Sequence, residues 1–114
     1  MNLTEEEDHM IECRNIDEVR TNIDIIDREI VKLLSERNKY VRQAANFKKN
    51  ADDVKAPNRI EEVISQVRNL ALEYESNPEI VEQVYRTMIA CFIDYEMKEI
   101  HRKAEMAELD TAER

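Results

Sequence analysis

Residues 15–50 decide the fold of this chain, and they read NIDEVRTNIDIIDREIVKLLSERNKYVRQAANFKKN. Apolar side chains recur in this stretch at alternating spacings of three and four residues, which places them on one face of a long helix. We therefore predict one continuous helix from about Asn15 to Asn50, with Asn15 and Glu18 satisfying backbone amides of its first turn. With ~34 residues it would be ~50 Å long. The apolar face consists of Ile16, Val19, Ile23, Ile26, Ile30, Leu33, Tyr40, Ala44 and Phe47.

Three cations interrupt this apolar face. Arg37 occupies the slot between Leu33 and Tyr40 where the spacing calls for an apolar residue, and Arg20 and Lys48 lie at the edge of the face. Arg37 and Lys48 would be ~16 Å apart along the helix, so their long side chains could bracket a small anion. Arg20 would be ~42 Å from Lys48, so it could serve such a site only in the partner chain of an antiparallel dimer. The alternative for each is a surface cation with a local acidic partner or a stem that covers apolar surface.

The composition indicates an all-helical protein with a single domain. The 114 residues include no glycine and only two prolines, so the positive-φ turns of β-hairpins are hard to build. A net charge of −9 repels phosphate backbones, which argues against general nucleic-acid binding. The acidic start is not a signal peptide, and no apolar run approaches the ~20 residues that a bilayer span needs.

The cysteines and histidines do not predict a metal site, because their spacing is not that of zinc ligands. We also find no motif for a cofactor, and two scattered cysteines are typical of a reducing cytoplasm. The residues concerned are His9, Cys13, Cys91 and His101.

Two further helices are predicted after the first. Pro57 suits the first position of a second helix that runs to about Tyr74, and Asn77 and Pro78 suit the cap and first position of a third. We expect the charged last turns of the third helix to fray from about Lys103. A second helix of ~26 Å cannot cover a first helix of ~50 Å, so the uncovered apolar face predicts an intertwined helical homodimer.

This pattern divides the chain into three parts. We expect a mobile acidic arm at residues 1–14, a single helical domain at residues 15–103 and a charged tail at residues 104–114.

Two more charged residues stand at unusual positions. Arg59 falls in the first turn of the second helix, where the helix dipole opposes a cation, and this hints at an anionic ligand.

Glu96 follows Phe92 by four residues and Ile89 by seven, so it lies on or beside the buried face of the third helix. A carboxyl group in such a setting favours its neutral form and could donate a hydrogen bond. An ordinary surface glutamate, paired one turn away, is the alternative. Together the charged residues indicate a pocket for a small polyanion.

These residues resemble the all-helical chorismate mutase family and its close relative, isochorismate pyruvate-lyase. The resemblance runs from about Ile16 to His101. It is carried by the Arg…Ile-Asp-x-x-Asp pattern at residues 20–27, Leu-x-x-Arg at 34–37, Phe-Lys at 47–48 and Pro-x-Arg at 57–59.

The resemblance implies a three-helix protomer in an intertwined homodimer with two equivalent sites and no cofactor or metal. Arg20 of the partner chain and Arg37 match the arginines that hold the carboxylates of a dianionic substrate. Lys48 matches the lysine beside the ether oxygen of the enolpyruvyl group, and Arg59 matches the arginine at the start of the second helix. Glu96 falls where the family has Gln or Glu as the second donor to that ether oxygen.

The implied reaction is that of chorismate mutase, the Claisen-type rearrangement of chorismate to prephenate in aromatic amino-acid biosynthesis. Ile60 and Ala56 depart from the pattern, because many mutases carry a glutamate and a polar or acidic residue there. Both changes move the sequence toward the lyase, which releases salicylate and pyruvate from isochorismate, whereas Glu96 in place of glutamine favours the mutase. The alternative from another class is a non-catalytic helical dimer that binds a ligand or a partner.

Overall fold

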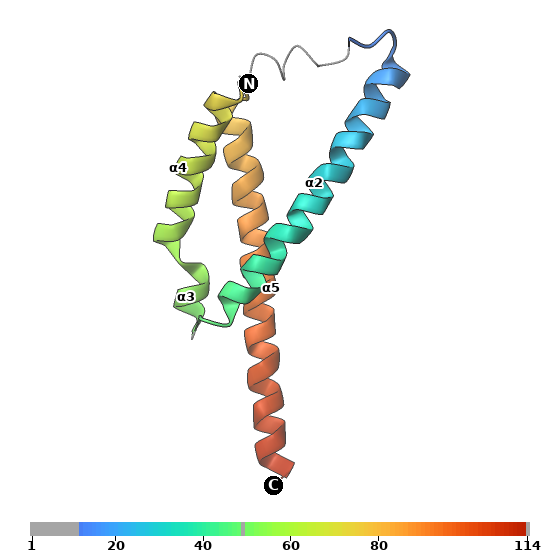
Figure 1. The fold of residues 1–114 in the computed structure, drawn as a ribbon. Helices are drawn as coiled ribbons and strands as arrows, with labels where there is room; N and C mark the ends of the chain where they lie inside the picture. The colour runs from blue at the N-terminus through green and yellow to red at the C-terminus, as the bar shows by residue number, and fades with distance from the viewer. Residues whose placement is uncertain (1–11, 49, 114) are drawn as a thin grey trace. The chain divides into compact units, whose positions relative to one another are not determined.

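The computed structural model describes residues 12–48 and 50–113, and each regular element in them is an α-helix (Figure 1). Helix α2 spans Ile16–Ala45, α3 spans Ala51–Lys55, α4 spans Pro57–Glu73 and α5 spans Pro78–Glu113. The all-α prediction is confirmed, with one short helix added to the three long ones. Residues 1–11 of the predicted arm lie outside the described residues.

Helix α2 begins where the sequence predicts it. The side-chain oxygen of Asn15 accepts a hydrogen bond of 2.9 Å from the backbone amide of Glu18, which satisfies a donor that the helix itself cannot pair. The carboxylate of Glu18 accepts a hydrogen bond of 2.9 Å from the amide of Arg14. Asn15 and Glu18 therefore cap the helix together, although Glu18 reaches one residue beyond the amide that a capping box uses.

The end of α2 differs from the prediction. The helix stops at Ala45, and the amides of the next three residues bond to carbonyls three residues back, which tightens the chain into a turn. Asn50, predicted as the last residue of α2, instead caps α3 by accepting a hydrogen bond of 3.0 Å from the amide of Asp53. An asparagine side chain competes with helix hydrogen bonds inside a helix and supports them at the start of one, and this explains the difference.

Helices α3 and α4 both pack against α5 (Figure 1). The buried apolar residues of this region are Val54 on α3 and Ile64, Val67 and Ala71 on α4. Pro57 opens α4 as predicted, and Asn77 caps α5 by accepting a hydrogen bond of 2.9 Å from the amide of Glu79. Fraying was expected from about Lys103, but α5 continues as a helix to Glu113.

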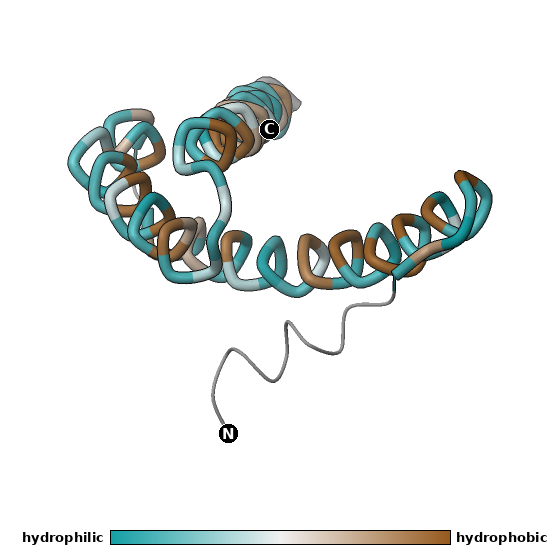
Figure 2. The backbone as a smooth tube through the Cα atoms, turned by 90° about the horizontal axis from the view of Figure 1, so that it is seen from above, coloured by the Kyte–Doolittle hydropathy of each residue, from teal (hydrophilic) through white to brown (hydrophobic). Residues whose placement is uncertain are grey.

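The chain contains two compact units, one ending at Arg42 and the other beginning at Gln43. The first unit contains most of α2, and no residue of this helix is buried within the single chain. Hydrophobic residues recur turn after turn along α2 (Figure 2), and its stripe includes Ile23, Ile26 and Ile30, each about half exposed.

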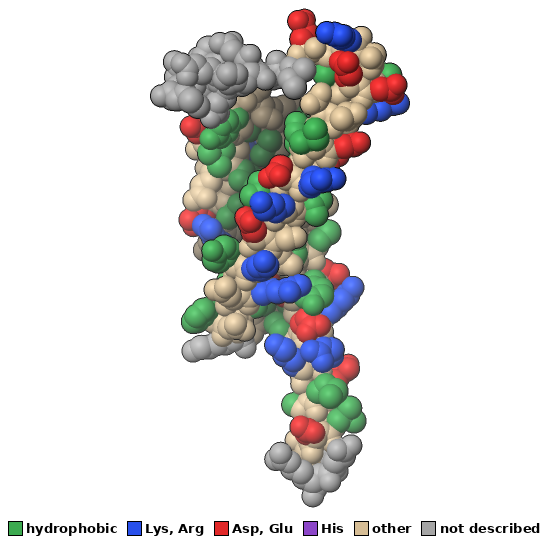
Figure 3. All heavy atoms as spheres, turned by 45° about the vertical axis from the view of Figure 1, so that its right-hand side comes forward, with side chains coloured by type: hydrophobic (Ala, Val, Ile, Leu, Met, Phe, Trp, Pro, Cys, Tyr) green, Lys and Arg blue, Asp and Glu red, His purple; other side chains and the backbone are tan. Residues whose placement is uncertain are grey.

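The surface mixes hydrophobic and charged side chains. On the face drawn in Figure 3, hydrophobic side chains reach the surface between lysines, arginines and acidic residues. Within residues 12–48 and 50–113, no helix is long and apolar enough to cross a membrane.

Candidate functional site

The structure brings two of the predicted site residues together. The Nζ atom of Lys48 lies 3.2 Å from Oε2 of Glu96, and the two side chains form an ion pair. Lys48 is 24% exposed and Glu96 is 11% exposed, so the pair is largely withdrawn from water. A charge-assisted hydrogen bond is stronger in such a setting than on an open surface. Residues separated by 48 positions in the sequence thus form one polar centre in the second unit.

Lys48 reaches this pair from a turn and not from a helix. The sequence predicted it at the edge of the apolar face of the first helix, but α2 ends at Ala45 and Lys48 follows in the turn after it. Arg37 and Lys48 therefore do not lie on one continuous helix, and the separation of ~16 Å that was predicted along such a helix is wrong. The turn frees the lysine side chain from the direction that a helix would impose on it.

Glu96 lies on α5, beside the face of that helix that packs against α3 and α4. Its low exposure confirms the prediction that it lies on or beside the buried stripe. Phe92, one turn before it, and Met97, next to it, are half-buried. The carboxylate faces an ammonium group, so two opposite charges compensate each other at this partly buried position.

The three predicted arginines lie on helices α2 and α4. Arg59 lies in the first turn of α4, as expected, and its Nη1 atom bonds to Oε1 of Glu62 at 2.8 Å on the same exposed helix surface. Arg20 is exposed on α2, and Arg37 is half-buried on the same helix, in the first unit. Arg59 thus forms a local ion pair on the exposed surface of its own helix.

A protein-family model matches the region of the chain that contains these residues. The model for chorismate mutase type II matches residues 19–97, which is more than half of the chain. The chain belongs to the chorismate mutase type II family. All five predicted site residues lie inside the matched region.

One curated relative of this chain is the isochorismate pyruvate lyase of Pseudomonas aeruginosa (strain PAO1). The two sequences are 29% identical over 87 residues, which cover 76% of this chain and 86% of the relative.

The sequence pattern did not predict helix α3, which follows Lys48 in the chain. It has only five residues, so it has no hydrophobic periodicity of its own. The signal that could have found it is Asn50 followed by Asp52 and Asp53, because a capping asparagine and first-turn acids favour a helix start. Val54, the apolar residue of this helix, is 3% exposed and packs in the core.

Ala56 forms a sharp corner between α3 and α4. Its φ of 29° and ψ of 62° lie in the left-handed region, which costs an alanine about 1 kcal/mol relative to a right-handed conformation. The chain contains no glycine that could relieve this cost. The corner directs the chain into Pro57 and Arg59, the Pro-x-Arg segment that the family resemblance rests on.

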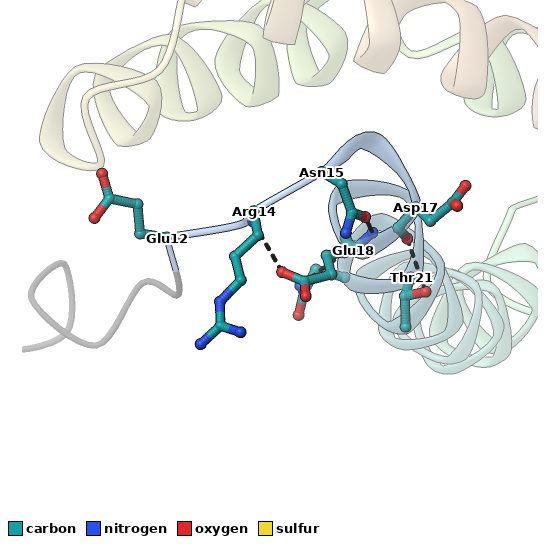
Figure 4. A pocket seen from close by; sticks show the side chains of 7 residues that line it. Glu12, Arg14, Asn15, Asp17, Glu18 and Thr21 are labelled. Carbon is teal, nitrogen blue, oxygen red and sulfur yellow. Dashed lines mark hydrogen bonds between the residues drawn. The ribbon is translucent and has the colours of Figure 1, made fainter.

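A shallow pocket lies at the start of α2, and none of the predicted site residues lines it (Figure 4). It is lined by Glu12, Arg14, Asn15, Asp17, Glu18, Thr21 and Asn22. Three carboxylates and one guanidinium do not suit a dianion, and the side chains of Asn15 and Glu18 are engaged in capping the helix. Among the described residues, no group of three His, Cys, Asp or Glu side chains could hold a metal ion.

Proposed function

We propose that this protein is a chorismate mutase, which rearranges chorismate to prephenate by electrostatic and conformational catalysis in a cationic pocket. The observation that carries the proposal is the ion pair between Lys48 and Glu96, at positions that match the family's two donors to the ether oxygen. Breaking the C–O bond leaves negative charge on that oxygen. An ammonium group and a protonated carboxyl group aimed at it would stabilise the transition state more than the ground state.

The arginines complete the proposed pocket. Arg37, Arg59 and the Arg20 of a partner chain would hold the two carboxylates of the substrate. A guanidinium can bind a carboxylate with two parallel hydrogen bonds, which fixes its orientation as well as its position. Such a grip would hold chorismate in its reactive diaxial conformer, and that conformational restriction is a large part of what the reaction needs.

A homodimer follows from the exposed stripe of α2. A long row of half-exposed isoleucines and leucines is stabilised by covering it, and a second copy of the same helix is the simplest cover. Such a dimer would allow Arg20 to contribute to the partner's site.

For the location of the protein we propose the cytoplasm, because two scattered cysteines in the sequence are typical of a reducing compartment.

Isochorismate pyruvate-lyase is the second candidate, and two observations favour it. The curated relative carries that name, and Ala56 and Ile60 replace the polar and acidic residues of many mutases. Both reactions break the ether bond to the enolpyruvyl group, so Lys48 and Glu96 would serve either one. The substrate ring and its hydroxyl group would then decide between them.

A side-by-side turnover assay with chorismate and isochorismate tests the proposal. Prephenate from chorismate supports the mutase, whereas salicylate and pyruvate from isochorismate support the lyase. In either case Lys48→Ala should lower kcat/KM by about 10²-fold or more, the usual cost of removing one donor to a developing oxyanion.

Lys55→Ala is the matched control, because Lys55 is an exposed lysine on α3, seven residues further along the same segment. It should leave turnover unchanged. If the folded wild-type protein turns over neither substrate, the non-catalytic dimer becomes the better account.

A further inference from the structure

The segment that carries Lys48 is attached to α5 at two points. One is the ion pair with Glu96, and the other is Val54, which is 3% exposed in the core where α3 packs against α5. We propose that Val54 is a positioning residue for Lys48, a role that rests on the proposed function. It anchors the segment so that the ammonium group stays in place while the ion pair is exchanged for the substrate.

Hydrogen bonds hold the described residues near each of the two points. The amide of Lys48 bonds to the carbonyl of Ala45 at 3.1 Å, which fixes the turn after α2. Asn50 then caps α3 twice, because its side chain accepts from the amide of Asp53 and its carbonyl accepts from the amide of Val54 at 3.3 Å. A displacement of Val54 would therefore move Asn50, and we infer that Lys48, two positions earlier in the sequence, moves with it.

The ion pair cannot by itself hold Lys48 during the reaction. The ammonium group of Lys48 donates a hydrogen bond to Glu96. In the proposed reaction both groups turn their hydrogen bonds to the ether oxygen, so their mutual attraction no longer fixes the segment. Val54 is apolar and buried, so it offers the substrate no hydrogen bond, and we expect its packing to persist through the reaction. A misplacement of about 1 Å in a catalytic group can cost ~10²-fold in rate.

The test compares two equal truncations in the same packed unit. Val54→Ala and Val67→Ala each remove two methyl groups from a buried position, and Val67 lies on α4. Both variants should lower the urea midpoint. Only Val54→Ala should lower kcat, by about tenfold or more and with a smaller change in KM, because Lys48 acts mainly in the transition state. Val54→Ile, which keeps the anchor, should restore kcat.

A second pair of variants avoids core damage altogether. Asn50→Ala removes the side-chain cap of α3, and Asn77→Ala removes the corresponding cap of α5. Asn50→Ala should lower kcat by several-fold, and Asn50→Asp should recover it because aspartate caps equally well. Asn77→Ala should leave kcat unchanged.

The possible results separate this inference from the proposed function. If the wild-type protein turns over neither chorismate nor isochorismate, both are overturned. If the wild-type protein is active but Val54→Ala and Val67→Ala lower kcat equally, or Asn50→Ala has no effect, only the positioning role is overturned. A loss of kcat confined to Val54→Ala and Asn50→Ala supports both.

Discussion

Glu96 is a carboxyl group at a position where the family also uses an amide. A glutamine can donate a hydrogen bond at any pH, whereas a glutamate can donate one only when it is protonated. Glu96 lies 3.2 Å from Lys48, so the two side chains can face the same atom of a substrate. In the proposed reaction Glu96 must carry a proton to donate a hydrogen bond to the ether oxygen.

This requirement predicts a pH dependence of turnover. In the wild-type protein kcat/KM should fall as pH rises, because the role that we propose for Glu96 needs its protonated form. In Glu96→Gln the same profile should be flat on its alkaline side, because the amide donates throughout. Initial rates measured from mildly acidic to mildly alkaline pH would check this, and parallel profiles for the two proteins would contradict it.

At the scale of elements, a chain of charges joins α4 to α5. Arg86 on α5 donates to both carboxylate oxygens of Glu61 on α4, at 3.0 and 3.1 Å, and to Glu82 at 2.7 Å. Arg68 on α4 also donates to Glu82, at 2.7 Å. The Arg86 guanidinium lowers the pKa of Glu61, and Arg86 followed by Arg68 lowers the pKa of Glu82. The two carboxylates in turn raise the pKa of Arg86.

These shifts predict a change in stability on the acid side. A carboxylate whose pKa is lowered by folding contributes stability above its unfolded pKa, and that stability is lost as pH falls from about 4.5 through the folded pKa. Arg86→Gln should therefore lower the melting temperature at neutral pH, and the difference from wild type should shrink in acid. Because the groups are exposed, the effect should be small and should weaken further in high salt.

Thermal melts across the acid range would measure this effect. Lys98→Gln is the control, since Lys98 pairs only one turn away, with Asp94 on its own helix, in a contact that joins no two elements. It should leave the acid side of the curve unchanged. A constant difference between Arg86→Gln and wild type at all pH values would show that the charges are not responsible.

At the scale of the whole molecule, the apolar stripe of α2 predicts a dimer. Ile26→Glu would place a charge in the middle of that stripe, where Ile26 is 58% exposed in the single chain. We expect wild-type protein to sediment at twice the 13.5 kDa chain mass and Ile26→Glu to dissociate or to lose most of its stability. Ser35→Glu, on the opposite face of the same exposed helix, should remain dimeric. A wild-type protein that sediments as a monomer at all concentrations would contradict the prediction.

The same dimer can be tested for shared sites. Chains carrying Arg20→Ala or Arg37→Ala should each be inactive alone. When they are mixed and allowed to exchange, each heterodimer should regain one working site, because one pocket then receives both intact arginines. An absence of recovery despite proven exchange would argue that Arg20 does not act across the interface.

The sequence by itself determined the helical class, the family and the first residues of the three long helices. Asn15, Pro57, Asn77 and Pro78 act through local hydrogen bonds and backbone geometry, so their effect can be predicted without knowledge of the fold. The low exposure of Glu96 was also predictable, because it follows from the spacing of its neighbours on one helix.

Only the tertiary structure decided how Lys48 reaches Glu96. The apolar spacing continued past Ala45 to Phe47, so nothing in the periodicity indicated that the helix would stop and release Lys48 into a turn. Five residues of α3 form a helix because Asn50 caps them and Val54 packs against α5. Contacts between residues far apart in sequence depend on how helices pack, and the pattern along a single helix does not contain that information.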